Sequence, residues 1–258
     1  AIGPYAGDAI TTGGDNTALG HKALSTVSTG GGNTAMGREA MRDSSAGATG
    51  NTAIGQGALF SSGTPTGSTT LGWGSSYYPT GNYNVFLGYK AGYGNVSTNS
   101  AHNNVAVGKE SLNSILDGQE NAALGDQAGY AITSGDYNVG LGSDALRNVT
   151  TGHGNIGIGR LAGSILADHS YTVAIGYGAG QDAVTQSSVL IGHSAGYNNN
   201  GGDNNVFIGK SAGVNVTTGG SNVIIGPSAG PSSTSTASNE LYIHNAQGTP
   251  LIGGDFSA

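Results

Sequence analysis

Apolar and small residues recur along this chain at fixed distances from a glycine. Leu, Ile, Val or Met stands directly before the glycine, Thr or Val usually stands three residues before it, and a small residue, mostly Ala, stands three residues after it. We number these positions −1, −3 and +3, with the glycine at position 0. Positions −3 and −1 share one face of a β-strand, and their β-branched side chains favour a strand over a helix.

The glycine recurs fourteen times at spacings of 16 to 20 residues, most often 17. A unit of this size with one five-residue strand cannot bury its own apolar face, but stacked units can. The sequence therefore predicts an all-β, parallel β-solenoid (β-roll) of about fourteen 17-residue coils over residues 1–230. A C-terminal cap or neck is expected at 231–258, leading toward a missing downstream segment; in it, a degenerate fifteenth copy has His244 at the glycine position. The anchor glycines are Gly3, Gly20, Gly37, Gly55, Gly72, Gly88, Gly108, Gly125, Gly142, Gly159, Gly176, Gly192, Gly209 and Gly226.

Asparagine dominates position −4, with Ser or Thr as the substitute. In a stack of coils these side chains would form a ladder in which each amide donates and accepts, and would satisfy buried turn backbone without any catalytic role. Glycine at the corner would permit the backbone dihedrals that a tightly wound coil requires. Asparagine occupies this position at Asn16, Asn33, Asn51, Asn84, Asn104, Asn121, Asn138, Asn155, Asn205 and Asn222.

The strands are apolar on both faces. We expect positions −3 and −1 to point into the coil. Position −2, on the opposite face, is also often apolar, as at Ala53, Phe86, Leu190 and Ile224. Because such strands are normally buried on both sides, the pattern predicts a second layer from another chain, most simply a parallel homotrimer.

Composition excludes several classes of protein. Glycine makes up 49 of the 258 residues, and because each helical glycine costs about 1 kcal/mol relative to Ala, an all-helical fold is excluded. Only 9% of residues are charged and the net charge is −7, which argues against a nucleic-acid partner. No apolar run reaches the roughly 18 residues of a membrane helix, so we expect no membrane insertion. The absence of Cys excludes disulfides, zinc–cysteine sites and thiol catalysis.

The repeats NTAIGQGAL (51–59), NVFLGYKAG (84–92) and NVFIGKSAG (205–213) resemble the head repeats of bacteriophage tail fibres and of tail-fibre-like trimeric surface proteins. Residues 239–258 resemble the passage that in those proteins leads to a self-cleaving intramolecular chaperone of the endosialidase type. The repeats are more loosely similar to the β-roll heads of trimeric autotransporter adhesins. The resemblance implies an elongated homotrimeric fibre segment, on a virion tail fibre or at a cell surface, that binds a host or surface receptor, commonly a glycan.

The most irregular part of the repeat array is rich in aromatic residues. Rings with polar tips are the usual platform for sugars or protein partners, so we take these residues as candidate ligand-binding positions. The three-residue insertion, in 93–104, follows at once, and longer turns in a solenoid often carry function. The alternative is that the rings pack between chains. The candidates are Trp73, Tyr77, Tyr78, Tyr83, Tyr89 and Tyr93.

The two positions after each anchor glycine hold six of the eight cations, together with His21, Trp73, Tyr89, Tyr177 and His193. This stripe is either a solvated ridge or a contact face. The six cations are Lys22, Arg38, Lys90, Lys109, Arg160 and Lys210.

Motifs for catalysis and metal binding are weak. Three segments, 192–196, 209–213 and 226–230, match the G-x-S-x-G nucleophile elbow, but all lie in repeat register and no helical segment follows. The six His lack ligand spacing, so we expect neither a metal nor a cofactor.

The leading hypothesis is a non-enzymatic fibre or adhesin segment that presents turns and aromatic patches to a cell-surface glycan or protein. One alternative is an ice-binding solenoid, because Thr17, Thr34, Thr52 and Thr69 stack in the first coils. Another is a polysaccharide depolymerase, in which Asp126 and Asp144 of successive coils would supply paired carboxylates.

Overall fold

The computed structural model describes residues 1–60, 63–78, 81–94, 100–246 and 250–255. It contains two compact units, Ala1–Asp136 and Tyr137–Ala258. Each unit is a parallel β-solenoid, and the described residues form about 13 turns of about 17 residues with no helix. The predicted fold class is therefore confirmed. Residues 95–99 of the predicted insertion lie outside the described residues.

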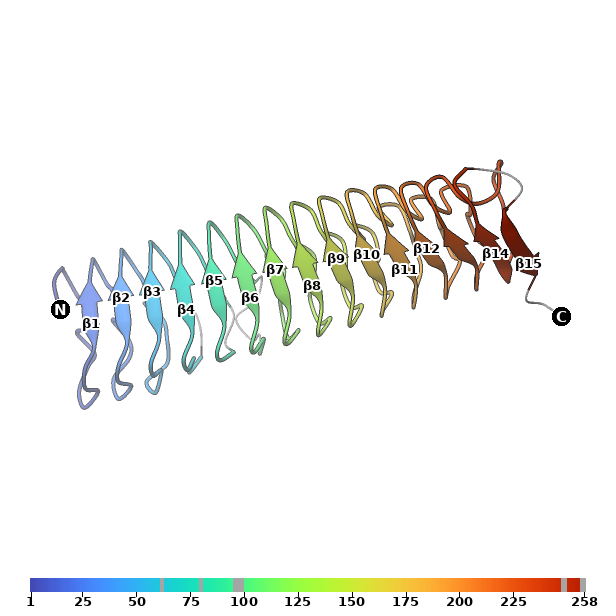
Figure 1. Cartoon of the computed structure of the whole chain (residues 1–258). Coiled ribbons are helices and arrows are strands. Elements are labelled where there is room, and N and C mark those ends of the chain that lie inside the picture. Colours follow the sequence, from blue (N-terminus) through green and yellow to red (C-terminus); the bar gives the residue numbers. More distant parts are fainter. Residues whose placement is uncertain (61–62, 79–80, 95–99, 247–249, 256–258) are drawn as a thin grey trace. The chain divides into compact units, whose positions relative to one another are not determined.

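The first unit stacks seven three-residue strands side by side in parallel (Figure 1). Each strand covers positions −3 to −1 only, which is shorter than the five residues expected. Equivalent residues are paired in register, as in Thr17 with Thr34 and Thr34 with Thr52. The strands are β1 Thr17–Leu19, β2 Thr34–Met36, β3 Thr52–Ile54, β4 Thr69–Leu71, β5 Val85–Leu87, β6 Val105–Val107 and β7 Ala122–Leu124.

The second unit continues the same pattern and ends with a different pairing. Ile225 of β13 pairs with Ile243 of β14, which places His244 next to Gly226 in repeat register. Strand β15 then runs antiparallel to β14 and is exposed along its length. The strands are β8 Val139–Leu141, β9 Ile156–Ile158, β10 Val173–Ile175, β11 Val189–Ile191, β12 Val206–Ile208, β13 Val223–Ile225, β14 Glu240–Ile243 and β15 Ile252–Asp255.

The prediction of which strand face points inward is wrong. Position −2 is buried in the strands of both units, as at Ala53, Phe86 and Leu190, whereas positions −3 and −1 lie on the outer face. Leu71 at position −1 is 50% exposed. The strands are indeed apolar on both faces, but position −2 forms the inner face.

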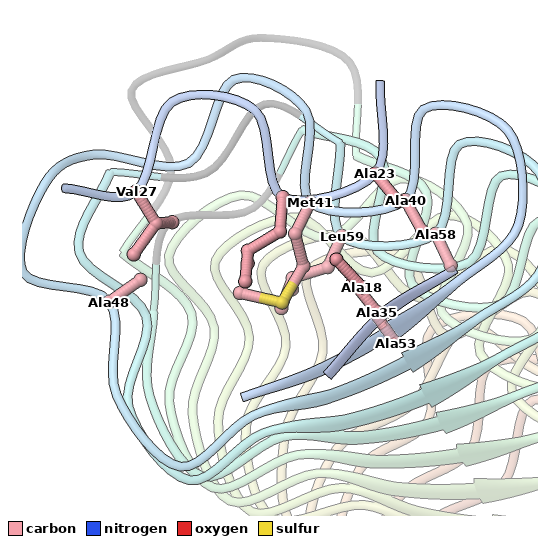
Figure 2. Packing of buried hydrophobic residues seen from close by; sticks show 11 residues of the cluster. Ala18, Ala23, Val27, Ala35, Ala40, Met41, Ala48, Ala53, Ala58 and Leu59 are labelled. Atoms are coloured by element: carbon pink, nitrogen blue, oxygen red, sulfur yellow. The ribbon is translucent and has the colours of Figure 1, made fainter. Parts of the chain in front are cut away.

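The reason is the narrow interior, which positions −2 and +4 share. A Cβ on Gly92 at position +4 would lie 2.4 Å from Phe86 at position −2, and one on Gly213 would lie 2.5 Å from Phe207. In the first coils the sizes are reversed, and Figure 2 shows rows of small alanines at positions −2 and +3 on successive coils, with Met41 and Leu59 near them in the interior. Because protein interiors are close-packed, a large residue at one position requires a small one at the other.

Each coil turns at residues with left-handed backbone conformation. Positions −5, +2 and +4 repeatedly have φ near +55°, and among the described residues no Val, Ile or Thr has a positive φ, as steric crowding at a branched Cβ requires. The anchor glycine is constrained further. Gly55 has φ +132°, and a Cβ there would lie 2.4 Å from the carbonyl oxygen of Gly72 on the next coil. The positive φ agrees with the predicted role of the corner glycine, and the close stacking of backbones is a second reason that it recurs.

The predicted asparagine ladder is confirmed. The Nδ2 of Asn51 donates to Oδ1 of Asn33 at 3.0 Å and to the Pro65 carbonyl at 2.8 Å, and its backbone N–H also donates to Asn33 at 3.0 Å. In the second unit, the N–H of Asn155 donates to Oδ1 of Asn138 at 2.9 Å. These bonds satisfy buried polar groups whose desolvation would otherwise be costly.

Candidate functional site

Five of the six predicted aromatic residues gather in the first unit. Trp73 stacks on Tyr89, with ring centroids 5.2 Å apart. Tyr77 stacks on Tyr93 at 5.3 Å, and Tyr78 meets both of these rings edge-on. The rings form two walls, because Trp73 and Tyr89 occupy position +1 of successive coils whereas Tyr77 and Tyr93 occupy position +5.

Backbone hydrogen bonds between coils hold these rings in register. The N–H of Gly74 donates to the Gln56 carbonyl at 2.9 Å, and that of Lys90 donates to the Trp73 carbonyl at 2.9 Å. The second wall is anchored by the N–H of Tyr78, which donates to the Tyr93 carbonyl at 3.0 Å. The spacing of the rings is thus set by the rise of the solenoid, about 4.8 Å per coil.

A groove of about 120 Å³ lies between the two walls. Position +2 contributes Gly57 to its lining. Gly74 holds the same position on the next coil, whereas most other coils carry a side chain there. A Cβ on Gly57 would lie 3.1 Å from the Tyr77 ring. The residues lining the groove are Glu39, Gln56, Gly57, Trp73, Tyr77 and Tyr93.

Charged residues occupy position +2 on the coils flanking these two glycines. Glu39 lies 3.4 Å from Arg42 and 3.5 Å from Arg38, so its charge is compensated. Lys90 on the other side lies 5.6 Å from the Trp73 ring centroid and 5.0 Å from that of Tyr93. The two flanks of the groove therefore differ in sign, and each charge is held by neighbouring groups.

Burial is the largest cause that raises the pKa of Tyr77 and of Tyr93 above the ordinary value of 10.0. Both hydroxyls consequently remain protonated at neutral pH and can donate or accept hydrogen bonds. The groove thus offers flat apolar rings, phenol hydroxyls, the Gln56 amide and the Glu39 carboxylate to a ligand.

The sixth predicted residue, Tyr83, lies elsewhere. It occupies position −5, at another corner of the coil, where its ring covers Gly67 and 58% of the residue is exposed. Sequence reasoning also missed Phe60, which stacks on Tyr77 at 4.4 Å and carries Arg42 at 4.1 Å above its ring. Aligning position +5 of successive coils would have placed Phe60 in line with Tyr77 and Tyr93.

A larger hollow of about 400 Å³ lies over the first coils of the same unit. Its lining mixes charges, and its strongest donor, Arg42, is already bound to Asp43 at 2.7 Å. The hollow also lacks stacked rings. The residues lining it are Tyr5, Asp8, Lys22, Ser25, Arg42 and Asp43.

The structure offers no support for the catalytic motifs considered above. Ser194, Ser211 and Ser228 of the three G-x-S-x-G segments lie at position +2 with φ of 55°, 55° and 54°, in turns rather than before helices. Asp126 lies 3.9 Å from Lys109 in the first unit, and Asp144 lies 3.3 Å from Arg147 in the second, so each carboxylate has a cation near it. Among the described residues there is neither a group of three His, Asp or Glu able to hold a metal ion nor a helix able to span a membrane.

Comparisons with protein-family models, with curated proteins and with solved structures found no match to this chain.

Proposed function

We propose that this chain is a structural, receptor-binding fibre segment, of a phage tail fibre or a surface adhesin, that acts outside the cell without catalysis or a cofactor. The observation that carries the proposal is the groove between Trp73, Tyr77 and Tyr93. A regular solenoid supplies a rigid frame, and rigid frames favour precise binding sites.

The ligand that fits the groove best is a cell-surface glycan. Sugar rings combine apolar faces with polar edges, and the groove combines aromatic walls with the Gln56 amide, the Glu39 carboxylate and two protonated phenols. Because Glu39 is compensated by Arg38 and Arg42, the site favours an uncharged sugar.

The outer sheet face supports assembly with further copies of the same chain, and we propose a parallel homotrimer. In the second unit this face carries only Val, Ile and Leu on β8 to β13. In-register pairing makes it a continuous apolar surface, which in soluble proteins usually marks an interface. A repeated strand surface is matched most simply by an identical one.

The glycan proposal is tested with an array of neutral oligosaccharides. Binding is expected for the wild type and is expected to weaken about 30-fold in Trp73→Ala, as for a truncated aromatic hot spot of about 2 kcal/mol. The matched control is Tyr83→Ala, an exposed aromatic residue of the same unit outside the groove, which should bind as the wild type does. The absence of any glycan binding, or equal loss in both variants, would refute the proposal.

The homotrimer is tested by sedimentation. Ile158→Glu combined with Ile175→Glu places charges on the outer face of β9 and β10 and should convert trimers to monomers, whereas the control Gln186→Glu adds a charge at an exposed turn and should not. A wild-type monomer would contradict the assembly.

Ice binding is the second candidate, favoured by one observation. The Thr17, Thr34, Thr52 and Thr69 ladder lies on the outer face rather than inside, in strict parallel register. A freezing assay should then show thermal hysteresis that is lost in Thr34→Tyr combined with Thr52→Tyr. No hysteresis in the wild type removes this candidate.

A further inference from the structure

The second unit carries a ring-and-cation strip at position +1, made of Arg160, Tyr177, His193 and Lys210 on four successive coils. All four residues are exposed. The N–H at position +2 of each next coil donates to the carbonyl of the strip residue before it, at 3.0 Å for Arg160, 2.9 Å for Tyr177 and 2.8 Å for His193. The coils thereby hold the strip in register, so its two cations are anchored about 14 Å apart.

The centre of the strip is a pair of rings that stack on each other. Tyr177 and His193 stack with centroids 5.2 Å apart and planes 14° apart. Arg160 Nη1 donates to the Tyr177 hydroxyl at 3.1 Å, and its guanidinium carbon lies 5.7 Å from the ring centroid. These contacts hold the guanidinium beside Tyr177, at one end of the stacked ring pair, and leave its remaining N–H donors available to a ligand.

The cations of the strip differ from those at position +1 in the first unit. Arg38 lies 3.5 Å from Glu39, and Lys109 lies 3.7 Å from Glu110. Within the described part of the second unit neither Arg160 nor Lys210 forms an ion pair. Their positive charges are therefore available to an anion that reaches both.

Beside the stacked rings a buried glycine occupies position +2, as in the first unit. Position +2 next to Tyr177 is Gly178, and a Cβ there would lie 3.3 Å from Gln181 Oε1 and 3.9 Å from the Tyr197 ring. Glycine occupies position +2 at only three anchored coils, and each time, at Gly57, Gly74 and Gly178, a tyrosine stands at position +5 of the next coil. In the second unit this tyrosine is Tyr197, whose side chain is hydrogen-bonded to that of Asp182.

We infer that this strip binds an acidic glycan, a chain of carboxylate-bearing sugars that lies along the solenoid. The sugar chain lies along the outer edges of Tyr177 and His193, one carboxylate pairs with the Arg160 fork, and another reaches Lys210. The inference rests on the proposed function and adds a second site with a different charge preference. Nucleic acid fits less well, because its binding normally uses many phosphate contacts and the strip supplies two cations.

The test compares a tetramer of galacturonic acid with its methyl ester, which keeps the sugar and removes the charge. Calorimetry is performed on the full chain and on Arg160→Gln combined with Lys210→Gln. The control is Lys109→Gln combined with Arg147→Gln, which removes two cations that each have a carboxylate nearby and lie outside both the strip and the groove. We expect the free acid to bind the wild type and the control within twofold of each other, and the strip variant and the ester to bind at least tenfold more weakly.

Several outcomes overturn the inference. These are equal binding of acid and ester, wild-type affinity in the strip variant, or tighter binding of a single-stranded oligonucleotide than of the acid. Unchanged thermal unfolding of both variants verifies that a loss is not caused by misfolding. Neutral-glycan binding at the groove without acid binding at the strip refutes the strip alone, whereas the absence of all glycan binding refutes the proposed function as well.

Discussion

The groove of the first unit and the strip of the second use the same repeat positions, but they differ in whether the cations at position +1 have carboxylates nearby. Both place aromatic rings at position +1 beside glycine at position +2. In the first unit the two cations at position +1, Arg38 and Lys109, have carboxylates within 4 Å, at 3.5 Å and 3.7 Å. In the second unit Arg160 contacts the Tyr177 hydroxyl instead. The difference shows that the solenoid fixes where a side chain lies, while one or two substitutions per coil change the charges around it.

The largest effect is expected from Gly55→Ala, which tests whether the two sites fold independently. The new Cβ would lie 2.4 Å from the Gly72 carbonyl oxygen at a φ of +132°, so the free energy of unfolding should fall by about 3 kcal/mol or more. Neighbouring coils alone feel such a change in a solenoid, so groove binding should be lost and strip binding kept.

Denaturant unfolding and the two binding assays measure this effect. The control is Gly14→Ala, because nothing lies within 4 Å of its added Cβ, and it should leave both sites intact. Equal loss of both sites in Gly55→Ala would show that the units do not unfold separately.

A smaller loss of stability, expected to be equal in both units, should follow from adding a methyl group to the interior. Gly92→Ala and Gly213→Ala each bring a Cβ to about 2.5 Å of a phenylalanine ring, at 2.4 Å for Phe86 and 2.5 Å for Phe207. Overpacking should lower the free energy of unfolding by about 2 kcal/mol in each case. Combining Gly92→Ala with Phe86→Leu should recover part of the loss in denaturant unfolding. Markedly unequal costs would mean that the two interiors, and not only the surfaces, differ.

The strip and the groove should also differ in how strongly salt weakens ligand binding. Raising sodium chloride from about 0.05 M to about 0.5 M should weaken acid binding at the strip about tenfold, because exposed charges are screened, and should change neutral-glycan binding less than about twofold. Calorimetry at the two concentrations measures both responses. A salt-sensitive groove would contradict the compensation of Glu39 by Arg38 and Arg42.

The smallest effect concerns alkaline pH. Burial raises the pKa of Tyr77 and Tyr93 in the first unit and of Tyr197 in the second. Since the unfolded chain ionises first, near pH 10, the stability from these phenols is fully present below that pH and is lost as the pH rises through the folded pKa values. The thermal unfolding temperature should therefore fall less steeply with pH above pH 10 in Tyr77→Phe combined with Tyr93→Phe than in the wild type. The control Tyr83→Phe should follow the wild type, and identical slopes for all three would contradict the expectation.

Much of the site could be anticipated from the repeat. The period predicts that Trp73 stacks near Tyr89 and that Tyr77 stacks near Tyr93, because in-register coils place equal positions one above the other. The separation of Tyr83 from the others also follows from its different repeat position. The groove itself was not predicted. It depends on Gly57, which has no side chain to fill the space between Trp73 and Tyr77, and a search for aromatic residues does not detect a glycine between them.

The sequence by itself determined the coil period, the anchor glycine and the asparagine ladder, because each follows from backbone geometry that repeats with every turn. Only the tertiary structure decided which strand face is inside. Both faces are apolar, so polarity could not separate them. Packing did, because position −2 faces position +4 across a narrow interior, where Phe86 requires Gly92, while positions −3 and −1 lie on the outer face. The tertiary structure also decided which cations at position +1 form ion pairs. A cation there is available to a ligand only if no carboxylate lies beside it on its own or an adjacent coil.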